Sequence, residues 1–139
     1  MRDHIYTQVP FKLSEIEHRY GPQVHITADP VMLGQLAKLC AKETFQPEIN
    51  RLVASIYLDL VKQVVNAEFP RREISVPTRM INYTPMGIFH GQIISPETRS
   101  VVVNIARAGT LPSQVPYDFL NPVRAPRLVR QDHIIMSRL

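Results

Sequence analysis

The stretch "VVVNIARAGTLPSQ", residues 101–114, decides how the second half of this chain is organised. It begins with three consecutive valines and continues through Asn104 to Ile105, a pattern that is apolar on both faces and typical of a buried parallel strand. The loop "RAGT" follows at once, and Pro112 then favours the start of a helix. Whether Arg107, at the mouth of this turn, binds a ligand or is ordinary surface charge depends on the rest of the chain.

Before this stretch, the pattern predicts helices. "LSEIEHRYG" is compatible with a short helix that ends at Gly21, and "DPVMLGQLAKLCAKE" predicts a helix with Asp29 as N-cap and Pro30 in the first turn. A longer helix is predicted from Pro47 over "PEINRLVASIYLDLVKQVVNAEF". Its expected buried stripe consists of Ile49, Leu52, Val53, Ile56, Leu60 and Val64.

The remaining elements are predicted to be short, because most of the 12 prolines lie in the second half of the chain. "EISVPTRMI" is a strand candidate that Pro77 limits to a sheet edge, and "GIFHGQIIS" favours a strand over a helix. The helix after the "RAGT" loop is expected to be brief, because Pro116 introduces a second break. "HIIM" near the C-terminus predicts another buried strand.

Composition limits the class of protein. The 139 residues suffice for one domain, and 45% hydrophobic with 20% charged residues is the balance of a globular chain. No apolar run is long enough to cross a membrane and no signal peptide is recognisable, so we expect a cytoplasmic protein. A single cysteine, Cys40, excludes an internal disulfide, and the net charge of +4 favours an anionic partner, a phosphorylated metabolite or a nucleic acid.

The strand, the loop "ARAG", a short helix and a second strand ending in "MSR" together resemble the uracil phosphoribosyltransferases of the type I phosphoribosyltransferase fold. The resemblance extends from about Asp29 to Arg138 and includes the opening pair of helices with the "ET" turn between them. It implies an α/β fold in which N-terminal helices precede the first strands of a mainly parallel, incomplete sheet. One domain, 1–139, would then contain a helical region, 1–69, and a region of strands with the pyrophosphate loop, 70–139.

The resemblance also implies an activity and a site. Such an enzyme transfers phosphoribosyl from phosphoribosyl pyrophosphate to uracil and yields UMP and pyrophosphate, in pyrimidine salvage. Arg107, Ala108 and Gly109 would bind the pyrophosphate of the donor, and Arg138 at the end of the last strand would also contact the donor. Magnesium would accompany the donor without ligands assignable in this chain, and the full-length protein would be a homodimer.

The second half of the family signature does not occur in this sequence. The acidic, Thr-Gly-rich loop for the 5′-phosphate and the uracil-recognition loop would both lie after Leu139, so we expect the chain to be an N-terminal portion with negligible transferase activity of its own. Two alternatives stay open: a non-catalytic regulator that keeps the anion loop, and a small basic α/β protein that binds nucleic acid.

Other polar residues favour ordinary structural roles. Residues 101–139 contain five arginines and two aspartates, and we interpret Arg124, Arg127 and Arg130 as a solvated basic connection. The five histidines lack the spacing of a metal site. Asp132 and His133 are interpreted as a pair at the entry to the last strand, not as an acid–base couple. The catalytic residues are left unassigned.

Overall fold

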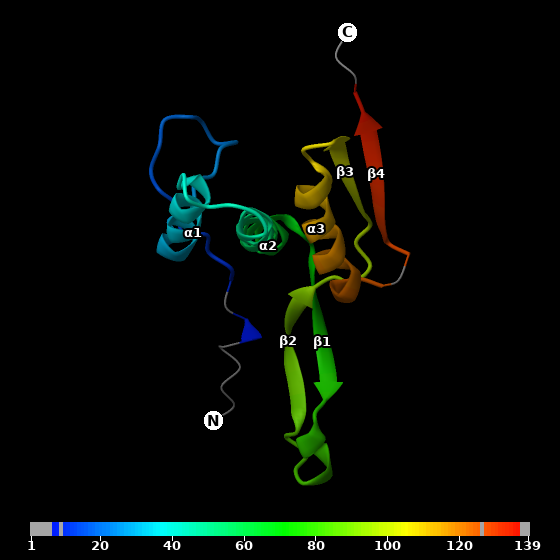
Figure 1. The fold of residues 1–139 in the computed structure, drawn as a ribbon. Helices are drawn as coiled ribbons and strands as arrows, with labels where there is room; N and C mark the ends of the chain where they lie inside the picture. The colour runs from blue at the N-terminus through cyan, green and yellow to red at the C-terminus, as the bar shows by residue number, and fades with distance from the viewer. Residues whose placement is uncertain (1–6, 9, 126, 137–139) are drawn as a thin grey trace.

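The computed structural model describes residues 7–8, 10–125 and 127–136. Three α-helices and four strands follow one another along these residues, with a helical pair first and strands concentrated in the second half (Figure 1). The strands form two separate pairs, one antiparallel and one parallel. The predicted α/β fold class is therefore confirmed.

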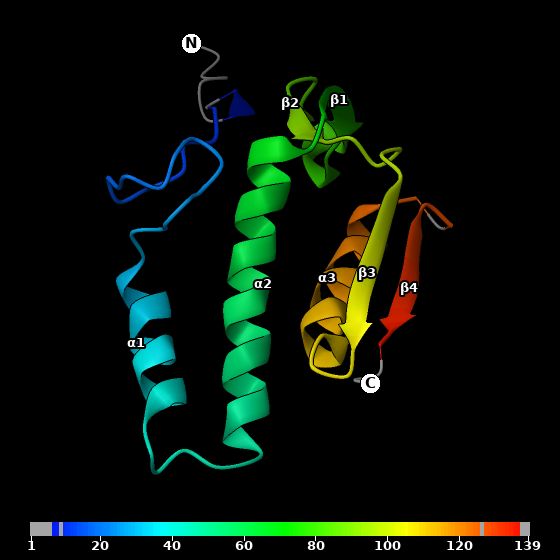
Figure 2. The same cartoon turned by 90° about the horizontal axis from the view of Figure 1, so that it is seen from above.

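The two predicted N-terminal helices are present. Helix α1 spans Pro30–Cys40, and the Asp29 carboxylate caps it by accepting hydrogen bonds from the backbone N–H groups of Val31 and Met32, both at 3.0 Å. Helix α2 spans Glu48–Glu68 and begins directly after Pro47. The two helices lie side by side and run in opposite directions, with α2 between α1 and α3 (Figure 2).

The segment before α1 does not form the expected short helix. Its backbone pairs with a later extended segment instead: Ile16 N–H donates to Ile26 O and Ala28 N–H donates to Ser14 O, both at 2.9 Å. The chain reverses at Gly21, which has a φ of +92° that glycine adopts without steric cost. Long-range pairing across this turn therefore replaces the local hydrogen bonds of a helix.

The first two strands form a hairpin that projects from the body of the molecule (Figure 1). Strand β1, Arg71–Pro77, pairs antiparallel with β2, Ile88–Ile94, and the short 3-10 helix η2, Arg79–Asn82, lies in their connection. Pro77 is at the end of its strand, where a missing N–H interrupts no ladder. Both strand predictions are confirmed.

The parallel pair consists of β3, Ser100–Ala106, and β4, Val129–Ile135. Helix α3, Thr110–Val123, connects them and covers one face of the pair (Figures 1 and 2). Both strands were predicted, but the expected burial of "HIIM" is not seen, because Ile134, Ile135 and Met136 are 49%, 85% and 67% exposed. The expected burial of β3 on both faces is not seen, because among the described residues β3 pairs with β4 alone, and Val101, Val103 and Ile105 are more than half exposed.

Helix α3 is longer than the sequence suggested. It begins two residues before Pro112 and continues through Pro116 and Pro122 for 14 residues. Pro116 cannot donate a hydrogen bond to the carbonyl four residues earlier, which normally weakens a helix. Packing offsets this loss, since α3 lies between α2 and β3 and buries Leu120 against both. The predicted second break was therefore wrong.

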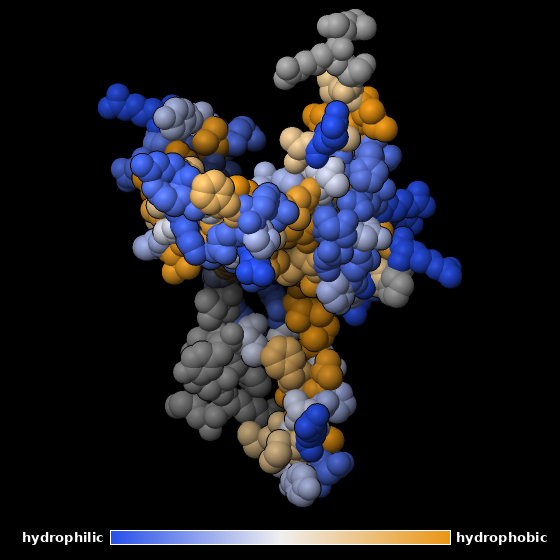
Figure 3. Space-filling view, in the orientation of Figure 1, coloured by the Kyte–Doolittle hydropathy of each residue, from blue (hydrophilic) through white to orange (hydrophobic). Residues whose placement is uncertain are grey.

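The core is centred on Val65, Leu120 and Val129, one from α2, one from α3 and one from β4. The predicted stripe of α2 is only partly buried: Leu52 is 8% exposed, whereas Leu60 and Val64 are 37% and 55% exposed. Apolar side chains also gather on the β1–β2 hairpin and near the end of β4 (Figure 3).

Candidate functional site

The loop 107–109 lies at the carboxyl end of β3 and leads directly into α3. It is a tight connection, in which Gly109 N–H donates to Ile105 O at 3.0 Å and Thr110 N–H donates to Arg107 O at 3.1 Å. The peptide bond between Ala106 and Arg107 is cis. Three of the four predicted ligand residues are thus adjacent in one turn, at the end of a parallel strand where α/β folds present ligand loops.

Gly109 is required by the packing of the helix against the strand. Its φ of −74° is open to any residue, so backbone conformation does not select glycine here. A Cβ at this position would lie 2.9 Å from Ile105 O and 3.1 Å from the Cβ of Asn104. The absence of a side chain therefore lets the first turn of α3 approach the last residues of β3 closely.

Arg107 is exposed, and among the described residues no carboxylate forms an ion pair with it. Arg107 lies between the end of β3 and the N-terminus of α3. The aligned peptide dipoles at a helix N-terminus also favour negative charge. Ala108 is exposed beside it. Arg138, the fourth predicted residue, lies outside the described residues.

A buried network of polar side chains connects the strands to the helix that follows loop 107–109. Asn104 is 3% exposed, and its Nδ2 donates to Ser113 Oγ at 2.9 Å and lies 2.7 Å from His133 Nδ1 on β4. Ser113 in turn donates its hydroxyl to Thr110 O at 3.0 Å, and its N–H bonds to Gly109 O at 2.9 Å. The network therefore connects β3, β4 and the first turn of α3.

Sequence reasoning missed this network. The available signal was Asn104, a polar residue inside the apolar run "VVVNIA", since a polar side chain in such a place needs a buried partner. Its partners Ser113 and His133 are nine and 29 residues away. His133 lies within β4, so its interpretation as part of a strand-entry pair was wrong.

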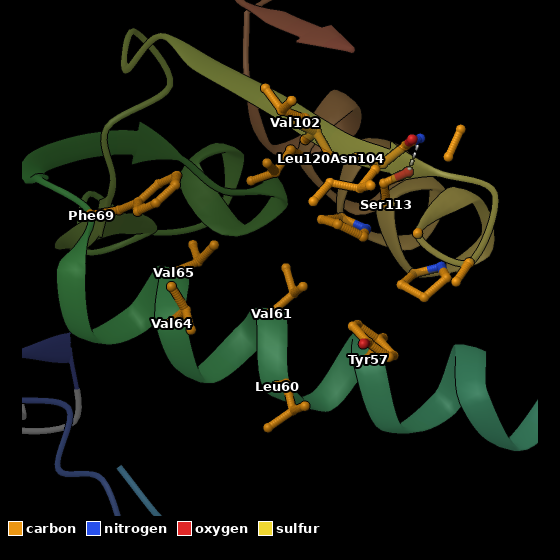
Figure 4. A pocket seen from close by; sticks show the side chains of 17 residues that line it. Tyr57, Leu60, Val61, Val64, Val65, Phe69, Val102, Asn104, Ser113 and Leu120 are labelled. Carbon is orange, nitrogen blue, oxygen red and sulfur yellow. Dashed lines mark hydrogen bonds between the residues drawn. The ribbon is translucent and has the colours of Figure 1, made fainter. Parts of the chain in front are cut away.

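A pocket of about 730 Å³ opens between α2 and the β3–α3 unit (Figure 4). Apart from Asn104, Ser113 and the phenol of Tyr57, the side chains on its wall are apolar. Figure 4 shows Val61 and Val65 from α2, and Phe69 directly after that helix, facing Val102 and Leu120 across this space. Its chemistry suits an apolar group, whereas a pyrophosphate would need the exposed, charged side of the loop.

The predicted basic connection contains one arginine that is not solvated. Arg124 is 4% exposed, stacks over the ring of Phe69 at 4.5 Å from the centroid, and donates from Nη1 to Ser95 O. Burial lowers the pKa of this guanidinium below its usual value. Arg124 therefore holds the segment after α3 against the end of α2.

Two further properties concern only the part of the chain that the structure describes. No group of three or more histidine, cysteine, aspartate or glutamate side chains is arranged to hold a metal ion. No described helix is both long enough and apolar enough to cross a lipid bilayer.

Comparison with known proteins gives a fold but no family. The structure is similar to that of the AQ2163 protein from Aquifex aeolicus, with a TM-score of 0.53 and 15% sequence identity over 82% of this chain. This chain spans about half, 47%, of the length of that protein. No family model matches the sequence, and no curated protein does. At this identity the similarity supports a shared fold alone.

Proposed function

We propose that this chain carries the donor-binding loop of a uracil phosphoribosyltransferase, with loop 107–109 binding the pyrophosphate of phosphoribosyl pyrophosphate. The observation that carries the proposal is the exposed, unpaired Arg107 at the carboxyl end of a parallel strand, next to a glycine that lets the following helix approach. Uracil as acceptor, a homodimer and a cytoplasmic role in pyrimidine salvage belong to the same proposal, which rests on the resemblance of "ARAG" and "MSR" to that family.

The chemistry of the loop fits this ligand. A guanidinium stays charged at any working pH and offers paired N–H donors to phosphate oxygens. Among the described residues, the backbone N–H groups of Arg107 and Ala108 donate no hydrogen bond, so both are available to an anion. Loop 107–109 carries no carboxylate and does not form a magnesium site; in the proposal the metal enters on the pyrophosphate oxygens of the donor.

In the proposed reaction, a uracil nitrogen forms a bond to ribose C1 and loses its proton, while the bond from C1 to the pyrophosphate oxygen breaks. Negative charge accumulates on the departing pyrophosphate in the transition state. Arg107 would stabilise that charge and hold the donor in place, which are contributions of electrostatics and positioning.

Donor binding is the direct test. Titration calorimetry with phosphoribosyl pyrophosphate and magnesium should show saturable binding, and Arg107→Gln should weaken it about 10- to 100-fold, the range expected for hydrogen bonds to a charged group. Arg51→Gln, which removes an exposed arginine from α2, is the control for net charge and should bind within about twofold of the unaltered chain. Equal affinity of the Arg107→Gln and control variants would overturn the proposed role of the loop.

A parallel assay for UMP formation separates the enzyme from the regulator. Turnover that depends on Arg107, in a protein that includes the residues following Leu139 if the natural chain is longer, supports the transferase. Donor binding without turnover in that protein would instead support a non-catalytic phosphoribosyltransferase-like regulator.

A further inference from the structure

A second group of cationic side chains lies at the opposite end of the parallel strands from loop 107–109. Arg99, Arg127 and Arg130 line a pocket of about 390 Å³, together with Ser100, Val101 and Leu128. Two of these arginines belong to the run that the sequence favoured as a solvated connection, and the third comes from the segment before β3. The pocket is a distinct feature of the β3–β4 unit.

Parallel pairing brings these arginines together. Ser100 is opposite Val129 and Val101 is opposite Arg130, so Arg99, immediately before β3, lies beside the start of β4. A further hydrogen bond from Ser100 N–H to Leu128 O, at 2.9 Å, holds the two chain segments together at this end. Three arginines from two segments that are about thirty residues apart in the sequence therefore line one pocket.

No carboxylate neutralises this group among the described residues. The nearest acidic residues along the chain have other partners: Glu97 binds Arg72 at 2.7 Å, and Asp132 accepts a hydrogen bond from the backbone N–H of His133 at 2.8 Å. Like charges at close range repel each other, so an anion with several oxygens would relieve the repulsion. Arginine is the side chain best suited to bind such an anion.

The backbone conformation of Arg127 also favours a ligand site at this pocket. Its φ of +73° is in the left-handed region, where glycine is favoured and a long side chain is uncommon. A glycine here would suit the turn better, yet an arginine occupies the position and lines the pocket. Unfavourable backbone geometry of this kind is found preferentially at ligand sites.

The size and lining of the pocket select a compact ligand. A volume of about 390 Å³ is near the lower end of the range for small-molecule sites. A phosphate chain matches this arrangement of three cations.

We infer that this pocket is a binding site for the polyphosphate group of a small phosphorylated ligand, separate from loop 107–109. Six residue steps along β3 separate the two ends of the strand, which is about 20 Å at the rise of a parallel strand. One pyrophosphate cannot occupy both places. The inference goes beyond the proposed function and does not depend on it.

Inorganic tripolyphosphate is the probe, titrated by calorimetry at low ionic strength into the Arg107→Gln chain, so that loop 107–109 contributes little. We expect saturable binding of one anion per chain. Arg127→Gly in that background should weaken it at least tenfold, and because glycine is favoured at this φ, the variant should fold at least as stably, as urea unfolding would show. Arg51→Gln is again the matched control and should leave the affinity within about twofold.

Two further arms identify the source of the phosphate. A nucleoside triphosphate that competes with tripolyphosphate supports a nucleotide, and its failure to compete while tripolyphosphate binds supports an inorganic or sugar polyphosphate. No saturable binding of tripolyphosphate, or equal binding by Arg127→Gly, would overturn the inference. Tight binding of a single-stranded RNA that tripolyphosphate cannot displace would also overturn it, in favour of a nucleic-acid surface.

Discussion

Replacement of Gly109 by alanine tests whether close packing selects this glycine. The new methyl group would lie 2.9 Å from Ile105 O, about 0.5 Å inside ordinary van der Waals contact, and that carbonyl already accepts the N–H of Gly109. Overpacking against backbone costs about 1–3 kcal/mol. Alanine recovers about 0.4–1 kcal/mol by restricting the unfolded chain, because the φ of −74° suits it. We therefore expect a net loss of about 1–2 kcal/mol of unfolding free energy.

Urea unfolding followed by circular dichroism measures this change. With a slope of about 2 kcal/mol per molar, the midpoint should fall by roughly 0.5–1 M. Gly34→Ala is the matched control: a Cβ at Gly34 meets nothing within 4 Å, and the position is inside α1, so stability should rise by about 0.5–1 kcal/mol. A Gly109→Ala protein as stable as the Gly34→Ala protein would refute the packing argument.

Three other substitutions each probe one hydrogen bond, and the second concerns Lys38 Nζ, which donates to Glu48 Oε1 at 2.6 Å. Asp29→Ala removes the N-cap of α1 and should lower the free energy of unfolding by about 1 kcal/mol in urea; an unchanged midpoint would contradict the capping role. Lys38 lowers the pKa of Glu48 by a hydrogen bond and by its charge, so this contribution to stability is present at neutral pH and is lost as the pH falls below about 4.5. In the Lys38→Met variant, the free energy of unfolding should fall less on acidification than in the unaltered chain. Identical plots of unfolding free energy against pH for the two proteins would refute the coupling of Lys38 to Glu48. Ser113→Ala removes the acceptor of a buried Asn104 N–H and should cost about 1–3 kcal/mol, whereas a neutral effect would show that the network is dispensable.

Elements whose stability is local could be predicted from the sequence. Helix α1 is specified by Asp29 and Pro30, which act on the backbone within one turn, and the structure shows both in those roles. Strand β3 is specified by its run of β-branched residues. In each case the residues that decide the element are inside it or adjacent to it.

Elements whose stability comes from distant partners were predicted less well. Pro116 should interrupt a helix, yet α3 continues because Leu120 and its neighbours pack against α2 and β3. Ile16 belongs to a segment that was compatible with a short helix ending at Gly21, but its amide pairs with Ile26 across a turn. Neither partner is evident from the spacing of apolar residues, since that pattern does not reveal which segments meet.

The same distinction applies to the two proposed anion sites. Loop 107–109 is one short stretch, so its arginine and glycine could be found from the sequence, although the ligand is still a proposal. The basic run before β4 was misleading because the fold divides it: Arg124 turns inward onto Phe69, while Arg127 and Arg130 join Arg99 from the start of the other strand. A charge count over consecutive residues cannot show this, because strand register, not sequence distance, determines which arginines are neighbours. The loss of tripolyphosphate binding in Arg127→Gly, but not in Arg51→Gln, would therefore test the register of β3 and β4 as well as the site that it creates.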